Sequence, residues 1–308
     1  MTSSIPDTTS FNIDKRWLRD SFNRAARTYD EAAVLQHEVG RRMLERLELI
    51  RIQPYIIFDI GAGTGRQTRD LPRHYPQART IALDLAPNML RHARQQLSWW
   101  QRRRHRHHFV CADAEQLPLV DCSVDLLFSN LTLQWCNDLD HVFSEFHRVL
   151  RPGGLLLFSS FGPDTLHELR ASWRSADSHN HVNAFIDMHD IGDALLRSGL
   201  GETVMDMEMI TLTYADVRTL MTDLKIIGAH NVTAGRPRGL TGRRQLQRLI
   251  SAYEAFRNKD NLLPASYEVI YGHAWKGVSQ AQTTLRDGSI SVPVSVLHDR
   301  HGKGGMTR

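Results

Sequence analysis

The chain has 308 residues, and 38 lysines and arginines against 34 aspartates and glutamates give it a net charge of +4. A composition of 41% hydrophobic and 23% charged residues is typical of a globular protein and excludes global disorder. Apolar runs fall short of the roughly 18–20 residues that cross a bilayer. The N-terminus lacks the pattern of a secretory signal. The three cysteines form no CxxC pair, so a soluble cytoplasmic protein without a membrane partner is expected.

The predicted elements begin with a helical region after a polar N-terminus. Residues 1–12 are expected to be mobile, and apolar side chains recur at helical steps over residues 14–50. Short apolar runs and helical segments then alternate, which predicts a parallel sheet of the α/β class with covered faces. Strands are expected at 55–60, 80–83, 109–112, 124–129 and 155–160, with a helix at 88–97.

The second half of the chain is less regular. It is predicted to be largely helical over residues 162–265, and we expect a mobile tail over residues 277–308. A strand is expected at 204–214, a helix at 243–257 and a last strand at 267–275.

A glycine-rich turn, DIGAGTG, follows the first predicted strand. Gly61, Gly63 and Gly65 would let a ligand approach the backbone at the start of a helix, where N–H groups are free. The spacing is GxGxG and differs from the GxGxxG of dinucleotide-binding folds. A tight turn without a ligand is the alternative.

Acidic residues follow the next two predicted strands. Asp84 can accept both hydroxyls of a ribose, or it can cap the helix that follows. Asp113, followed by Ala114, can accept from an adenine amino group, or it is a turn residue. Together with the glycine turn, these residues place contacts for a ribose, an adenine and an amino-acid moiety at successive strand ends.

This pattern resembles the Rossmann-like S-adenosylmethionine-dependent methyltransferases over about residues 45–162. The segments that carry the resemblance are DIGAGTG, ALDLAPNML, ADAEQLP, SNLTLQW and RVLRPGG. The resemblance implies S-adenosylmethionine as cofactor and a class I methyltransferase fold. In that fold a mostly parallel seven-stranded sheet has helices on both faces, with a helical lid and insertion added. The cofactor-binding residues it implies are Asp59, Gly61, Gly63, Gly65, Asp84, Leu85, Asp113, Ala114, Asn130 and Leu131.

A narrower resemblance covers about residues 12–277. FNRAARTYD, SNLTLQW, FGPDTLHELR, DLKIIGAHN, RQLQRLISAYE and YEVIYGHAWK are similar to the BioC family, the malonyl-acyl-carrier-protein O-methyltransferases of biotin synthesis. The resemblance implies one methyltransferase domain at 13–276, and residues 99–107 look like an insertion. Its parts are a lid at 13–52, a cofactor-binding core at 53–162 and a substrate insertion at about 163–265. The tail at 277–308 lies outside the family pattern.

The reaction implied by the resemblance moves a methyl group to the free carboxylate of malonyl-acyl carrier protein or malonyl-CoA. A carboxylate with a pKa near 4 is already ionised, so no general base is expected. Lys225 and Arg170 are the candidate cations for this carboxylate, and each has a plain surface residue as its alternative. Tyr29 is the candidate for packing on the cofactor and helping to fix the carboxylate, with a core tyrosine as the alternative. No metal is expected, because the histidines of RRRHRHH have no acidic or thiolate side chain nearby in the sequence that could complete a metal site.

The basic charge favours an acidic carrier protein as partner, because a basic surface steers it to the enzyme. The candidate surfaces are residues 102–106 and the group Arg236, Arg238, Arg243 and Arg244. No nucleic-acid partner is expected, since SNLTLQW lacks the proline-containing element of base-modifying methyltransferases. Two alternatives remain open: a related protein-arginine hydroxylase or assembly factor, and a methyltransferase acting on another small carboxylate.

Overall fold

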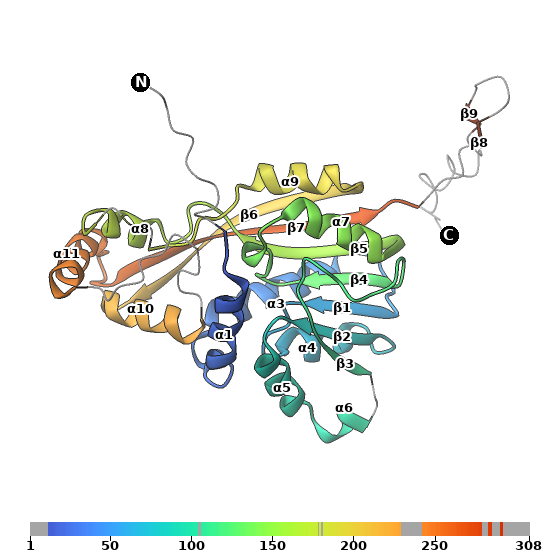
Figure 1. The fold of residues 1–308 in the computed structure, drawn as a ribbon, viewed down its shortest axis with the longest axis horizontal. Helices are drawn as coiled ribbons and strands as arrows, with labels where there is room; N and C mark the ends of the chain where they lie inside the picture. The colour runs from blue at the N-terminus through green and yellow to red at the C-terminus, as the bar shows by residue number, and fades with distance from the viewer. Residues whose placement is uncertain are drawn as a thin grey trace, which may run out of the picture.

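A seven-stranded sheet forms the centre of the protein in a computed structural model, in the order β3-β2-β1-β4-β5-β7-β6 (Figure 1). The structure describes residues 12–103, 106–177, 179, 181–228 and 242–278, and the backbone of 283–284 and 290–291. Strand β7 runs antiparallel to both of its neighbours, β5 and β6, while β1 to β5 pair in parallel. The strands are β1 (Ile56–Ile60), β2 (Arg79–Asp84), β3 (His107–Cys111), β4 (Val124–Ser129), β5 (Leu150–Phe161), β6 (Leu200–Tyr214) and β7 (Leu263–Lys276). This is the order expected of the class I methyltransferase fold.

Helices cover both faces of the sheet, so the central strands are apolar on both sides. In β1, Ile57 packs into the core formed with α3, α4, α8, α10 and α11, and Phe58 packs into the core formed with α7 and α9. The helices are α1 (Lys15–Ala25), α2 (Tyr29–Ala32), α3 (Val34–Glu48), α4 (Arg66–His74), α5 (Pro87–Gln96), α6 (Trp99–Arg103), α7 (Leu139–Val149), α8 (His167–Arg174), α9 (Met188–Arg197), α10 (Val217–Ile226) and α11 (Arg243–Tyr253). No helix in the described ranges is long and apolar enough to cross a membrane.

The second half of the chain is built around two long strands. Strands β6 and β7 extend past the short parallel strands, and α8, α10 and α11 gather at their extended end (Figure 1). The sequence predicted both strands, but β6 begins at Leu200 and β7 at Leu263, four residues earlier than expected in each case. Strand β6 forms the edge of the sheet with fifteen residues, and helices α8, α9, α10 and α11 lie in the rest of the region predicted to be largely helical.

The predicted N-terminal helical region is interrupted. It consists of α1, α2 and α3, and it breaks at residues 26–28 and at Ala33, whose ψ of 35° leaves the helical range. The prediction of mobile ends falls almost entirely outside the described residues. Within the tail, the structure describes Gly277, Val278 and the strand pair β8 (Thr283–Thr284) and β9 (Ile290–Ser291).

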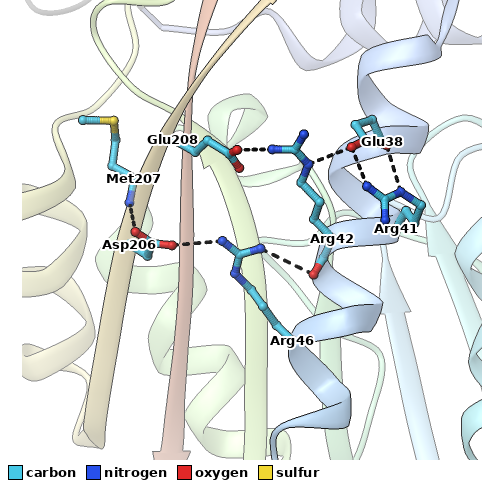
Figure 2. A network of polar contacts seen from close by, with 7 residues as sticks. All are labelled: Glu38, Arg41, Arg42, Arg46, Asp206, Met207 and Glu208. Atoms are coloured by element: carbon cyan, nitrogen blue, oxygen red, sulfur yellow. Dashed lines mark hydrogen bonds and ion pairs between the residues drawn. The ribbon is translucent and has the colours of Figure 1, made fainter.

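A network of ion pairs connects helix α3 to the edge strand β6 (Figure 2). Arg42 contacts Glu208, and the Arg46 guanidinium lies 2.9 Å from the Asp206 carboxylate and 3.8 Å from the ring centroid of Tyr271. Exposed pairs of this kind each contribute only about 0–1 kcal/mol. Their effect is positional: they fix α3, which borders the functional site, against a strand 160 residues later in the chain.

Candidate active site

The glycine turn lies at the carboxyl end of β1 and lines a pocket at this edge of the sheet, here called the strand-end pocket. Gly61, Gly63 and Gly65 all have positive φ, between 54° and 74°. A Cβ on Gly61 would lie 2.0 Å from the Thr132 hydroxyl, whereas one on Gly63 would meet nothing within 4 Å. Gly61 is therefore required by packing, and Gly63 leaves backbone open to a ligand. The pocket is lined by Lys15, Leu18, Phe22, Tyr29, Gly61, Gly63, Leu83, Asp84, Leu85, Met89, Ala112, Asp113, Ala114, Asn130, Leu131, Thr132, Trp135 and Cys136.

Asp84 ends β2 and points into the strand-end pocket. Its carboxylate accepts from the backbone N–H of Gly63 at 2.9 Å and of Ala86 at 2.7 Å. Burial raises the pKa of Asp84 to about 6, and these two N–H donors oppose the shift. The carboxylate thus braces the glycine turn and keeps acceptor capacity for a diol.

Asp59 and Gly65 lie behind the pocket and do not line it. Asp59 is buried and accepts from the hydroxyl of Thr68 on α4. Gly65 is the N-cap of α4, and a Cβ there would lie 2.7 Å from Ala93 on α5. Both residues, expected to bind the cofactor, instead support the turn that lines the pocket. We therefore expect them to contribute to cofactor binding through this turn.

Replacing Asp59 by asparagine should stabilise the protein at pH 8. Burial raises the pKa of Asp59 to about 7, from an ordinary value of 3.8. The native state therefore binds more protons than the unfolded state between about pH 4 and 7, and the free energy of unfolding falls as pH rises through this window. Asp59→Asn should recover about 1–2 kcal/mol at pH 8 and little at pH 4, measured by urea unfolding. Asp193→Asn, on the exposed side of α9, is the control. A loss of stability at pH 8 would contradict the assignment.

Lys15 forms ion pairs at the Asp113 side of the pocket, and the sequence did not predict them. Lys15 on α1 lies 2.9 Å from Asp113 and 2.9 Å from Glu115. Asp113 and Ala114 line the pocket, as expected for contacts to an adenine. Lys15 sits in no recognisable motif, and only the packing of α1 over the sheet edge brings it there. It fastens the N-terminal lid to the core.

The turn after β4 forms the floor of the pocket. Leu131 has a φ of 50°, which is unusual for a residue with a Cβ and is typical of functional turns. Its N–H donates to the Ser159 hydroxyl at 2.9 Å, and the Asn130 amide donates to the Gln36 carbonyl at 2.9 Å. Asn130 and Leu131 therefore line the pocket as expected, in a conformation that neighbouring strands and α3 hold in place.

Aromatic residues of the lid close the pocket on its remaining side. Phe22 lies 6.5 Å from Tyr29 and 5.6 Å from Trp135, in edge-to-face contacts between ring centroids. The hydroxyl of Thr64, inside the glycine turn, donates to the Asp30 carboxylate at 2.6 Å. Burial, together with the charges of Asp84 and Asp30, raises the pKa of Tyr29. Tyr29 thus stays a protonated phenol that can donate into the pocket.

Two further pockets adjoin one another and the strand-end pocket. A central pocket shares Trp135 with it, and an outer pocket shares Asn183 and Phe185 with the central one. The central pocket is mostly apolar and is lined by Ala32, Leu35, Gln36, Trp135, Phe161, Thr165, Leu166, Asn183, Phe185, Leu212, Tyr214, Asp223, Leu224, Ile227 and Tyr267. The outer pocket is lined by Pro163, Arg170, Trp173, Arg174, Asp177, His179, His181, Val182, Asn183, Ala184 and Phe185.

The two predicted cations are not brought together with the glycine turn. Among the described residues, Lys15 is the cation that lines the strand-end pocket, while Arg170 lines the outer pocket. Lys225 is exposed on α10, next to Asp223 and Leu224, which line the central pocket. Binding of the malonyl carboxylate by Arg170 or Lys225 stays a prediction. Lys225 adjoins residues that line the central pocket, whereas Arg170 lines the outer pocket.

Solved structures and sequence relatives define the class of this protein. The YcgJ protein from Bacillus subtilis matches with a TM-score of 0.55 at 18% identity, over 78% of this chain and 99% of that one. Phosphoethanolamine N-methyltransferase 2 from Haemonchus contortus, in complex with S-adenosyl-L-methionine, matches with a TM-score of 0.52 at 18% identity, over 84% of this chain and 60% of that one. The family described as "Methyltransferase domain" matches residues 58–158. The protein is therefore a class I S-adenosylmethionine-dependent methyltransferase.

Closer relatives narrow the class to one family. A malonyl-[acyl-carrier protein] O-methyltransferase from Gallionella capsiferriformans is 52% identical over 92% of this chain and 98% of its own length. Relatives of the same name from a Methylovorus species and Halorhodospira halophila are 53% and 49% identical, over 91% and 94% of this chain. The chain belongs to the malonyl-[acyl-carrier protein] O-methyltransferase family, and the predicted family membership is confirmed.

The strand-end pocket has the groups that S-adenosylmethionine requires. Open backbone at Gly63 suits the methionine moiety, the Asp84 carboxylate suits a ribose diol, and Asp113 can accept from an adenine amino group. Leu85 and Met89 add apolar surface between the last two. The residues present therefore fit this group.

Proposed function

We propose that the protein esterifies the free carboxylate of a malonyl thioester, carried by acyl carrier protein or CoA, with the methyl group of S-adenosylmethionine. The observation that carries the proposal is the roughly 50% identity to malonyl-[acyl-carrier protein] O-methyltransferases over more than 90% of the chain. The neighbouring strand-end, central and outer pockets support it, because the central one offers a mostly apolar lining beside the strand-end pocket for the chain of a thioester. A cytoplasmic location is part of the same proposal.

S-Adenosylmethionine supplies an electrophilic methyl carbon next to a positive sulfur. The carboxylate oxygen forms the new bond as the carbon–sulfur bond breaks and its electron pair stays on sulfur, so no proton moves. The protein's task is to align the reacting atoms and keep water out. Trp135 borders both the strand-end and the central pocket, and Tyr29 lines the former. We place the carboxylate between these two side chains, where the Tyr29 hydroxyl can donate to it.

The central pocket would hold the acyl chain and the start of its carrier arm. Its lining is mostly apolar: Tyr214, Tyr267 and Asp223 interact electrostatically with one another, and among the described residues Oε1 of Gln36 is buried without a hydrogen-bond partner. An apolar wall with few open polar groups suits a neutral thioester chain.

Replacing Lys225 by alanine should raise the KM for the malonyl thioester about tenfold, the cost of one charge-assisted contact. The dissociation constant of S-adenosylmethionine should change little, because Lys225 lies outside the strand-end pocket. Arg218→Ala is the matched control, since this exposed cation at the start of the same helix, unlike Lys225, does not adjoin a residue that lines the central pocket. Unaltered substrate kinetics would remove Lys225 from the site.

A methyl-transfer assay tests the proposed function. Labelled S-adenosylmethionine is offered with malonyl-carrier protein, malonyl-CoA or the unloaded carrier. Label on at least one malonyl thioester and none on the unloaded carrier is expected. Label on the unloaded carrier, or on none of the three, would overturn the proposal.

A further inference from the structure

The outer pocket carries a positive charge that the proposed position of the carboxylate, between Trp135 and Tyr29, leaves unused. Arg170 and Arg174 are four residues apart on α8, so their side chains share one face of that helix. Both line the outer pocket, which is separated from the strand-end pocket by the central one. The charge therefore lies at the opposite end of the path from the glycine turn.

Arg170 is held in place by the protein itself. Its guanidinium donates to the carbonyls of Pro163 at 2.8 Å and Thr165 at 3.0 Å. A guanidinium has five N–H donors, so this anchoring leaves further donors for a ligand. Burial lowers the pKa of Arg170, and the charge of Arg174 lowers it further, while Asp164 partly offsets them. The two positive charges thus repel each other, and a bound anion would relieve that repulsion.

The acid that lines the outer pocket is already engaged with other partners. Asp177 lies 2.8 Å from Nε2 of His181 and accepts from the backbone N–H of His179. The His181 ring stacks on Trp173, with 3.7 Å between centroids and 10° between planes. Asp177 therefore belongs to a local cluster and does not pair with the arginines, whose side chains form no ion pair among the described residues.

We propose that Arg170 and Arg174 bind the phosphate of the phosphopantetheine arm that carries the malonyl group. The proposal rests on the proposed function, which makes the substrate a thioester of such an arm. A phosphate at the outer pocket leaves the uncharged pantetheine chain in the central pocket and the carboxylate at Trp135. Two guanidinium groups on one helix face are a typical arrangement for a tetrahedral oxyanion.

The surroundings of the outer pocket favour acyl carrier protein over CoA as the source of this phosphate. The side chain of Gln245 on α11 donates to Asp177 at 3.4 Å, which puts the first turn of α11 beside the outer pocket. Arg243 and Arg244 are exposed in that turn, next to α8. The other predicted basic segment includes α6, which follows α5 at the β3 edge, far from α11 across the sheet (Figure 1). Arg236 and Arg238 lie outside the described residues.

The test compares malonyl thioesters with and without the phosphate. Wild type, Arg174→Ala, Arg174→Lys and Arg174→Glu are assayed with the malonyl thioesters of pantetheine and of phosphopantetheine. Arg174 is exposed, so these variants should fold, and thermal melting verifies it. We expect Arg174→Ala to raise KM about tenfold more for the phosphorylated thioester than for the other, and Arg174→Glu about a hundredfold more. Arg174→Lys should give an intermediate ratio. Arg73→Ala, an exposed arginine of α4 lining none of the three pockets, is the control.

Equal changes in KM for the two thioesters in every Arg174 variant would overturn the inference while leaving the proposed function intact. Wild-type enzyme that methylates neither thioester nor malonyl-carrier protein would overturn the proposed function, and the inference with it. Malonyl-CoA and malonyl-carrier protein, assayed with the same variants, identify the source of the phosphate. An Arg243→Glu/Arg244→Glu variant should raise KM for malonyl-carrier protein alone, and steeper salt dependence with that substrate should accompany it.

Discussion

Asp84→Ala should raise the dissociation constant of S-adenosylmethionine by about a hundredfold or more. The carboxylate is the acceptor that the strand-end pocket offers to a ribose diol, and each hydrogen bond to a charged group contributes about 1.5–3 kcal/mol. It also accepts from the backbone N–H groups of Gly63 and Ala86, so its removal loosens the turn as well. Calorimetric titration of the free enzyme measures the loss.

The Asp84→Ala variant should remain folded, so a loss of affinity can be attributed to the missing carboxylate. Burial raises the pKa of Asp84 to about 6, which means that its charge is unfavourable in the native state. Removing it therefore costs less stability than the two lost backbone hydrogen bonds alone would suggest. Asp84→Asn should bind with intermediate affinity, because it keeps one acceptor oxygen, and Asp193→Ala is the surface control. Unchanged affinity of Asp84→Ala would show that the ribose lies elsewhere.

Substitutions of Tyr29 should separate the ring from its hydroxyl. Tyr29→Ala removes an aromatic wall of the lid that contacts Phe22, and we expect kcat to fall about a hundredfold as alignment and water exclusion are lost. Tyr29→Phe keeps the ring and removes the donor to the carboxylate. It should lower kcat/KM for the malonyl thioester about tenfold and leave cofactor affinity close to that of wild type.

The two Tyr29 variants also test the alternative hypothesis that Tyr29 is a core residue, because that hypothesis predicts different results for each of them. If Tyr29 is only a core aromatic residue, Tyr29→Phe will retain full kcat/KM and Tyr29→Ala will lower the melting temperature together with activity. Steady-state kinetics and thermal melting of both variants distinguish the cases. Full activity in Tyr29→Ala would exclude a lid function.

The sheet and its ligand-facing turns were predictable because local sequence dictates them. Apolar runs bounded by glycine or acid identified β1 to β5, and the order of turns placed Gly63, Asp84 and Asp113 on one edge. The length of β6 was not predictable, since its burial alternates along an edge strand and depends on pairing with β7, far along the chain.

Residues that act through tertiary packing were harder to find. Lys15 reaches Asp113 from 98 residues away, and no local pattern marks it. Asp59 and Gly65 lie in the recognised motif, yet the structure turns them away from the pocket and toward α4 and α5. Arg170 was predicted as a candidate cation, but the sequence could not show that it lines a different pocket from the glycine turn.

The position of the transferred methyl group tests the central claim most directly. Malonyl-carrier protein and acetyl-carrier protein, which lacks the free carboxylate, are incubated side by side with enzyme and labelled S-adenosylmethionine. The products are examined by mass spectrometry and by mild alkaline hydrolysis. We predict label only on the malonyl sample, in an ester on the acyl group that alkali releases. Label on the acetyl sample, or stable label on the carrier polypeptide, would contradict carboxyl methylation in the joined pockets.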